Sequence, residues 1–173
     1  MTHSTFETDY LVVGSGAMGM AFTDTLLTET DADVIMVDRY DKAGGHWNVA
    51  YPFVTLHQPS LFYGVSSREL SSGRKDAVSL NKGMHELACG AEVSAYFDQV
   101  MRQRFLASGR VRFFPMCNYT GYGKCVSRVT GDTFEVSVRN TTVDATFLKT
   151  SVPATHTHTH TDSKCSRMSA LLL

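Results

Sequence analysis

The sequence has few cysteines and prolines and no surplus of charge of one sign. Its four cysteines, Cys89, Cys117, Cys125 and Cys165, show neither CxxC pairs nor the spacing of metal ligands, which argues against a disulfide scaffold or a zinc module. We therefore predict a reducing, cytoplasmic location. Lys and Arg number 16 against 17 Asp and Glu, a net charge of -1. Without a basic surplus, we expect no nucleic-acid partner.

Long hydrophobic runs are also missing. The segment 1–10 is polar and carries two acidic residues, unlike the basic start of a signal peptide. The apolar run 10–13 is far too short to span a bilayer, so we expect no membrane partner. With 43% hydrophobic and 19% charged residues in a chain of 173, the composition is that of a globular protein of about one domain.

The clearest pattern lies in the segment 9–38. An apolar run, 9–13, leads into the glycine-rich stretch 14–19, which opens a helical pattern that closes near 28–31. A second apolar run, 34–37, ends on Asp38. Strand, glycine turn, helix and strand make a βαβ unit with a right-handed crossover. The predicted fold class is α/β, a Rossmann-type domain with a parallel sheet, of the kind that binds FAD or NAD(P).

Beyond this unit the pattern is less regular. The segment 43–90 has no sustained period and predicts a long excursion with short helices. Apolar residues at three- and four-residue steps predict a helix over 92–108, with Gly109 as its stop. A further strand is predicted over 111–114. A small antiparallel β meander is predicted from three segments, 124–129, 133–139 and 142–148.

The carboxyl-terminal segment differs in character from the rest. We predict one domain over 1–153 and a low-complexity, disordered tail over 154–173, because the Thr-His repeat 155–161 offers no apolar face to bury. Three alternating histidines in this repeat would share one face of an extended chain and could capture a transition metal weakly. We predict no metal site.

The glycine turn has a physical mechanism for binding a dinucleotide. Gly14 permits a tight turn, Gly16 lets the backbone approach a diphosphate, and Gly19 lets the helix pack close to the strand. The diphosphate would lie on free N–H groups of the helix N-terminus, which include those of Ala17 and Met18. Asp38, about 20 residues further on, would accept hydrogen bonds from ribose hydroxyls. An acidic side chain there disfavours a 2′-phosphate, although Arg39 beside it works against this preference.

NAD and FAD share this fingerprint, and the segment 43–48 favours FAD. Its order, Ala-Gly-Gly-His-Trp-Asn, resembles the FAD site of flavin-containing monooxygenases and their relatives. The resemblance implies that this segment runs towards the flavin, that Gly44 and Gly45 let the backbone pass close to the cofactor, and that Trp47 beside His46 supplies a flat wall. It implies FAD as the cofactor and NAD(P)H as the electron donor of the complete enzymes.

The resemblance is specific over 9–60 and general thereafter. The family closes its FAD domain on Ala-Thr-Gly, whereas Ala145 and Thr146 are followed here by Phe147. The second glycine fingerprint, for the nicotinamide cofactor, and the late Gly-Asp motif are missing. The chain therefore resembles the amino-terminal part of such an oxidoreductase, and we expect little activity of its own unless a homodimer or second chain supplies the rest. An NAD-binding module without flavin and a non-catalytic nucleotide-binding fragment are the alternatives.

The segment 51–60 carries two adjacent polar residues near aromatic ones. His57 and Gln58 could face the flavin or the substrate, since an imidazole titrates near neutral pH. Their alternative role is purely structural. No catalytic residue is predicted, because in flavoenzymes the cofactor performs the chemistry.

Overall fold

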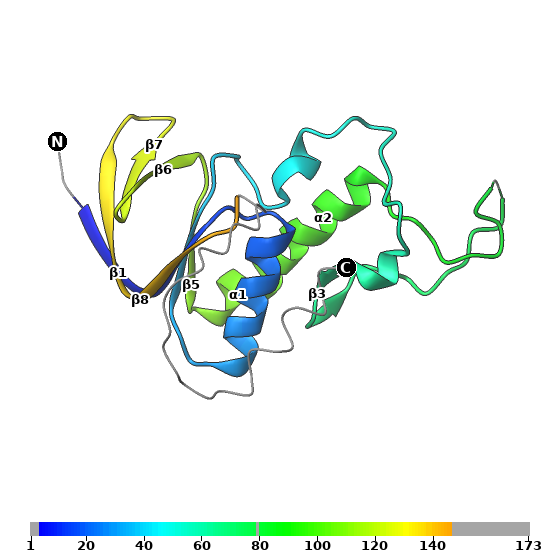
Figure 1. Cartoon of the computed structure of the whole chain (residues 1–173), viewed down its shortest axis with the longest axis horizontal. Coiled ribbons are helices and arrows are strands. Elements are labelled where there is room, and N and C mark those ends of the chain that lie inside the picture. The colour runs from blue at the N-terminus through cyan, green and yellow to red at the C-terminus, as the bar shows by residue number, and fades with distance from the viewer. Residues whose placement is uncertain (1–3, 79, 147–173) are drawn as a thin grey trace, which may run out of the picture.

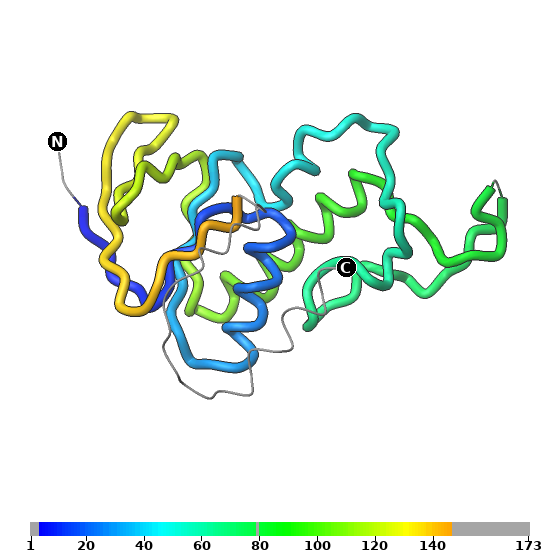
Figure 2. The backbone as a smooth tube through the Cα atoms, in the orientation of Figure 1, coloured from blue at the N-terminus to red at the C-terminus, as the bar shows by residue number. Residues whose placement is uncertain are grey.

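A computed structural model describes residues 4–78 and 80–146 (Figures 1 and 2). Within them, six strands form one sheet in the order β5-β2-β1-β8-β7-β6, and β3 and β4 form a separate antiparallel hairpin. The strands are β1 (Ser4–Val13), β2 (Val34–Val37), β3 (Gly64–Val65), β4 (Arg68–Glu69), β5 (Val111–Phe114), β6 (Cys117–Gly121), β7 (Lys124–Ser127) and β8 (Thr133–Asp144). The α-helices are α1 (Ala17–Glu29) and α2 (Gly90–Val100).

Four neighbouring strands form the parallel half of the sheet. β1 pairs in parallel with β2 on one side and with β8 on the other, and β2 pairs in parallel with β5. All four residues of β2 are buried, as expected for a parallel strand that is covered on both faces. The α/β, Rossmann-type prediction is confirmed, although β1 begins at Ser4 rather than at residue 9.

The meander is present, but its strands differ from the prediction. The segments 133–139 and 142–148 were expected as separate strands, yet residues 133–144 form the single strand β8, and the unpredicted β6 completes the meander. β8 stays continuous because it follows β1 along its whole length, with a register shift between Thr8 and Tyr10 that absorbs one extra residue of β8. A local pattern of turn-like residues could not reveal this non-local pairing.

The long excursion and the second helix agree with the prediction. Two 3₁₀ helices, Gly45–Asn48 and Ser60–Phe62, and the β3–β4 hairpin occupy the excursion. α2 is continued by a π-helical turn, Met101–Phe105, and a 3₁₀ turn, Leu106–Ser108. Gly109 then takes a left-handed conformation with φ of 71° and ends the helical segment.

The core has two parts, one on each face of the sheet. Val12 and Met36 face α1 and α2 and belong to the larger cluster with the helix residues. Leu11 and Ile35 face the other way and pack with Cys125 of the meander. Figure 1 shows this layering, with the helices on one side of the parallel strands and β6 and β7 on the other. The arrangement leaves the carboxyl ends of β1, β2 and β8 at one edge.

Two predictions concern residues that the structure does not describe. The tail 154–173, with its histidine repeat, and Phe147 lie outside the described residues. Across 4–78 and 80–146, no helix combines the length and apolar character needed for a membrane crossing.

Candidate functional site

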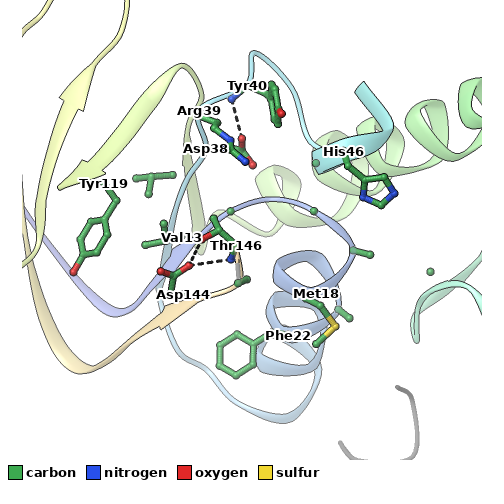
Figure 3. Close-up of a pocket in the computed structure, with 18 of the residues that line it drawn as sticks. Val13, Met18, Phe22, Asp38, Arg39, Tyr40, His46, Tyr119, Asp144 and Thr146 are labelled. Carbon is green, nitrogen blue, oxygen red and sulfur yellow. Dashed lines mark hydrogen bonds between the residues drawn. The ribbon is translucent and has the colours of Figure 1, made fainter. Parts of the chain in front are cut away.

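A pocket of about 1140 Å³ opens where β1, β2 and β8 end and α1 begins. This is the edge at which parallel α/β sheets bind ligands, outside the carboxyl ends of strands whose connections leave in opposite directions. Figure 3 shows Asp38 and Arg39 from the end of β2, Asp144 and Thr146 from the end of β8, and Met18 of α1 around it.

The glycine turn between β1 and α1 forms the floor of this pocket. Gly14 has φ of 97°, a conformation that favours glycine, and its N–H donates to the Val37 carbonyl over 2.8 Å. A Cβ on Gly19 would lie 2.0 Å from the Gly14 carbonyl oxygen, so the helix approaches the turn as closely as a glycine allows. The N-cap residue Gly16 has no side chain to cap α1, and the first N–H groups of the helix therefore remain for a ligand.

Asp38 is held by hydrogen bonds from the same turn. Its Oδ2 accepts from the backbone N–H of Ser15 at 2.5 Å and from the Ser15 hydroxyl at 2.6 Å. Its Oδ1 accepts from the N–H of Tyr40 at 2.8 Å, a bond drawn in Figure 3. Asp38 is 5% exposed and Ser15 is fully buried. Three protein donors thus fix the carboxylate at the rim of the pocket.

The two glycine motifs of the sequence form one structural unit. The N–H of Gly44 donates to the Ser15 carbonyl over 2.9 Å. A Cβ on Gly45 would lie 2.8 Å from the Gly16 Cα, so the two backbones touch. Gly44 and Gly45 have φ of 124° and 56°, which a bulkier residue adopts only with strain. The backbone of the second motif therefore packs directly against the first turn.

Trp47 lies in the core. It is 8% exposed, and its indole N–H donates to the hydroxyl of Tyr63 over 2.7 Å. Tyr63 lines the pocket, as does His46, whose ring centroid lies 4.9 Å from that of Trp47. Burial raises the pKa of Tyr63 above its usual value, with the Trp47 hydrogen bond opposing this shift. Tyr63 therefore presents a neutral phenol at neutral pH.

The structure brings most of the predicted site residues together. Nine of them line the pocket: Gly14, Gly16, Ala17, Met18, Asp38, Arg39, Gly45, His46 and Gln58. Four do not belong to its lining: Gly19, Gly44, Trp47 and His57. Gly19 and Gly44 contact the backbone of the turn without lining the pocket. The His57 side chain is exposed.

Other lining residues were not singled out from the sequence. Among them are residues at or beside the hairpin, in β6 and at the end of β8: Tyr63, Ser66, Cys117, Asn118, Tyr119 and Asp144. Only the sheet order, which places β6 and β8 beside this edge, could have identified them. Burial raises the pKa of the Cys117 thiol, so this side chain lines the pocket as a neutral group.

The charges around the pocket are few. Among the described residues of its lining, Arg39 is the only Lys or Arg, and Asp38 and Asp144 are the acidic side chains. A diphosphate in this pocket would therefore depend on backbone N–H groups and the helix N-terminus for its favourable electrostatics.

Comparison with known proteins finds relatives in sequence and solved structures with a similar fold. No protein-family model matches the chain. Uncharacterized proteins of Mycobacterium tuberculosis and Mycobacterium bovis are each 53% identical to it over 150 residues, or 87% of this chain. The match covers 28% of either relative, so the chain spans less than a third of the curated relatives it matches.

Solved structures share its fold at low identity. A flavin-containing monooxygenase from Stenotrophomonas maltophilia matches with a TM-score of 0.53 and 19% identity, over 82% of this chain and 38% of that one. An oxidized steroid monooxygenase bound to NADP matches at 0.58 and 22%, over 82% and 26%. A bacillithiol disulfide reductase from Staphylococcus aureus matches at 0.54 and 11%, over 82% and 39%. The chain therefore has the Rossmann-like fold of flavoprotein oxidoreductases.

Proposed function

We propose that this chain binds FAD by its ADP half in the pocket at the carboxyl ends of β1, β2 and β8. In this proposal it is the cofactor-binding part of a flavin-dependent, monooxygenase-like oxidoreductase. The observation that carries the proposal is the uncapped N-terminus of α1 beside Gly16. A Cβ on Gly16 would meet only the Gly45 Cα, at 3.6 Å, so the space above the turn is open to a ligand.

The residues present fit such a cofactor. The N–H groups at the start of α1 would bind the diphosphate, which benefits from the positive end of the helix dipole. Asp38, held at the rim, would accept ribose hydroxyls through the lone pairs that its protein donors leave free. His46, Gln58 and Tyr63 line the same pocket and would contact the flavin end.

FAD supplies two-electron redox chemistry when bound, with NAD(P)H as the electron donor that we propose for the whole enzyme. The described residues contain one glycine fingerprint. We therefore place the NAD(P)H site on surfaces outside them, in further sequence or in a second subunit, a homodimer included. The part of this chain is to bind the cofactor, orient it and exclude water from its diphosphate.

NAD binding without flavin is the second candidate, and Asp38 favours it as much as FAD. A carboxylate at this position suits any adenosine nucleotide whose ribose carries a free 2′-hydroxyl. The Gly-Gly-x-Trp order of residues 44–47 favours FAD, because the same order marks the FAD site of the family that this sequence resembles.

A competition experiment separates the two candidates. Dialysed protein is titrated into FAD, binding is followed by flavin fluorescence anisotropy, and ADP and NAD⁺ are added as competitors. We expect FAD to bind, ADP to displace it and NAD⁺ to compete more weakly. Binding of NAD⁺ without FAD would establish the alternative, and failure of both FAD and ADP to bind would contradict nucleotide binding altogether.

A further inference from the structure

Ser15 occupies a variable position of the glycine motif, yet it makes several specific contacts. Its backbone N–H and its hydroxyl both donate to Oδ2 of Asp38, at 2.5 and 2.6 Å. Its carbonyl accepts the N–H of Gly44 over 2.9 Å. Because Ser15 is fully buried, bulk water does not compete for these hydrogen bonds.

These contacts determine how Asp38 faces the pocket. Ser15 holds one carboxylate oxygen with two donors, while the N–H of Tyr40 binds the other oxygen. Rotating the carboxylate group would break charge-assisted hydrogen bonds, which are among the stronger kinds in proteins. The negative charge of Asp38 is therefore fixed at the rim before any ligand arrives.

The neighbouring cation is held differently. Arg39 is exposed, and its guanidinium lies 5.4 Å from the ring centroid of Tyr40. Its backbone carbonyl accepts a hydrogen bond from Arg128 over 2.6 Å. Arg39 thus has a solvent-exposed charge next to the fixed charge of Asp38, and both residues line the pocket.

We propose that Ser15 is a specificity-determining positioning residue, which fixes Asp38 so that the site accepts adenosine nucleotides with a free 2′-hydroxyl and rejects those with a 2′-phosphate. The inference rests on the proposed function, because it places the adenosine ribose at Asp38. A 2′-phosphate would meet a carboxylate that cannot turn away, and like charges held together in a partly dry site repel strongly. Without the Ser15 hydroxyl the carboxylate gains freedom, and Arg39 can pair with the phosphate.

The test compares two ligands that differ by one phosphate group. ADP-ribose and 2′-phospho-ADP-ribose are titrated by calorimetry into the wild-type chain and into Ser15→Ala. The ratio of their affinities is the readout, since a general loss of stability weakens both ligands alike. We expect the wild type to favour ADP-ribose, and Ser15→Ala to lower that preference by about tenfold, as expected for one hydrogen bond to a charged group.

Three further variants make the result decisive. Asp38→Asn removes the charge and should lower the preference at least as far as Ser15→Ala. Ser15→Cys leaves a side chain that fills the buried position but replaces the hydroxyl with a weak donor, so it tests the same point if Ser15→Ala fails to fold. The matched control is Ser60→Ala. Ser60 is also buried, with its hydroxyl hydrogen-bonded to backbone groups outside the pocket lining, and its loss should leave the preference unchanged.

The outcomes distinguish this inference from the proposed function. If ADP-ribose binds and the preference is the same in wild type, Ser15→Ala and Ser15→Cys, the role of Ser15 is overturned while nucleotide binding stands. If Asp38→Asn keeps the full preference, Asp38 is not the discriminating charge and the inference is again overturned. If neither ligand binds the folded wild type, the inference fails together with the proposed function.

Discussion

Two alanine substitutions in the glycine turn should separate folding from binding. A Cβ on Gly19 would lie 2.0 Å from the Gly14 carbonyl oxygen and 3.3 Å from Val12 Cγ1, so α1 must move away from β1. Overpacking of this kind costs about 3 kcal/mol, and the better helix propensity of alanine offsets about 1 kcal/mol of it. Gly19→Ala should therefore lower the free energy of unfolding by about 2 kcal/mol, which corresponds to a melting temperature roughly 6 °C lower.

Gly16→Ala should behave in the opposite way. Gly16 has φ of -73°, which any residue adopts, and its added Cβ would make one ordinary contact of 3.6 Å with Gly45. We expect its melting temperature to stay within about 2 °C of wild type. The new methyl group would occupy the space through which a diphosphate approaches the helix N-terminus, so affinity for ADP should fall about tenfold or more.

Thermal unfolding by circular dichroism and ADP titration by calorimetry measure the two effects on the same samples. A Gly19→Ala protein as stable as wild type would refute the close approach of α1 to the turn. A Gly16→Ala protein that binds ADP as tightly as wild type would refute the placement of the diphosphate on this turn.

Two further predictions concern buried charged and titratable groups. Arg104→Gln should lower the free energy of unfolding, measured in urea, by about 3 kcal/mol. The substitution removes the guanidinium that lies 2.5 Å from the fully buried Asp24 carboxylate. As a control, Arg102→Gln at an exposed ion pair should lower the same free energy by less than about 1 kcal/mol. Burial, with a smaller contribution from nearby Cys117, raises the pKa of Cys125 to about 11. Its folded thiol keeps a proton that the unfolded chain loses near pH 8.5, so this stability is complete below about pH 8.5 and is lost as pH rises towards 11. Cys125→Ala should flatten the fall in unfolding free energy between pH 8.5 and 11, and an unchanged slope would contradict the assignment.

The parts of the fold that could be predicted from the sequence are those with local signals. The βαβ unit was predictable because apolar runs, the glycine spacing and Asp38 all lie within one short stretch. α2 and the helical turns that continue it were predictable from the three- and four-residue spacing of their apolar residues. β8 was not, since its continuity depends on pairing with β1, more than a hundred residues away in sequence.

The site shows the same limit. The residues that we propose to bind a ligand through the backbone, such as Gly16, follow from the motif itself. Nothing in the sequence singled out Ser15, which stands at a position of the motif that many residues can occupy. Its hydrogen bonds to Asp38 join the end of β1 to the end of β2, and this contact is visible only in the folded chain. Trp47 was expected as a wall of the cofactor site, but its side chain is packed in the core and bonded to Tyr63. The direction of a side chain depends on tertiary contacts that a single sequence does not display.

The measurement that tests nucleotide binding at this turn most directly is an amide chemical-shift titration of the ¹⁵N-labelled chain with ADP. We expect saturable shifts at the amides of 14–19 and 44–46, with little change at residues 75–78 and 80–85, none of which lines the pocket. Shifts confined to other parts of the chain, or none at all up to millimolar ADP, would contradict it.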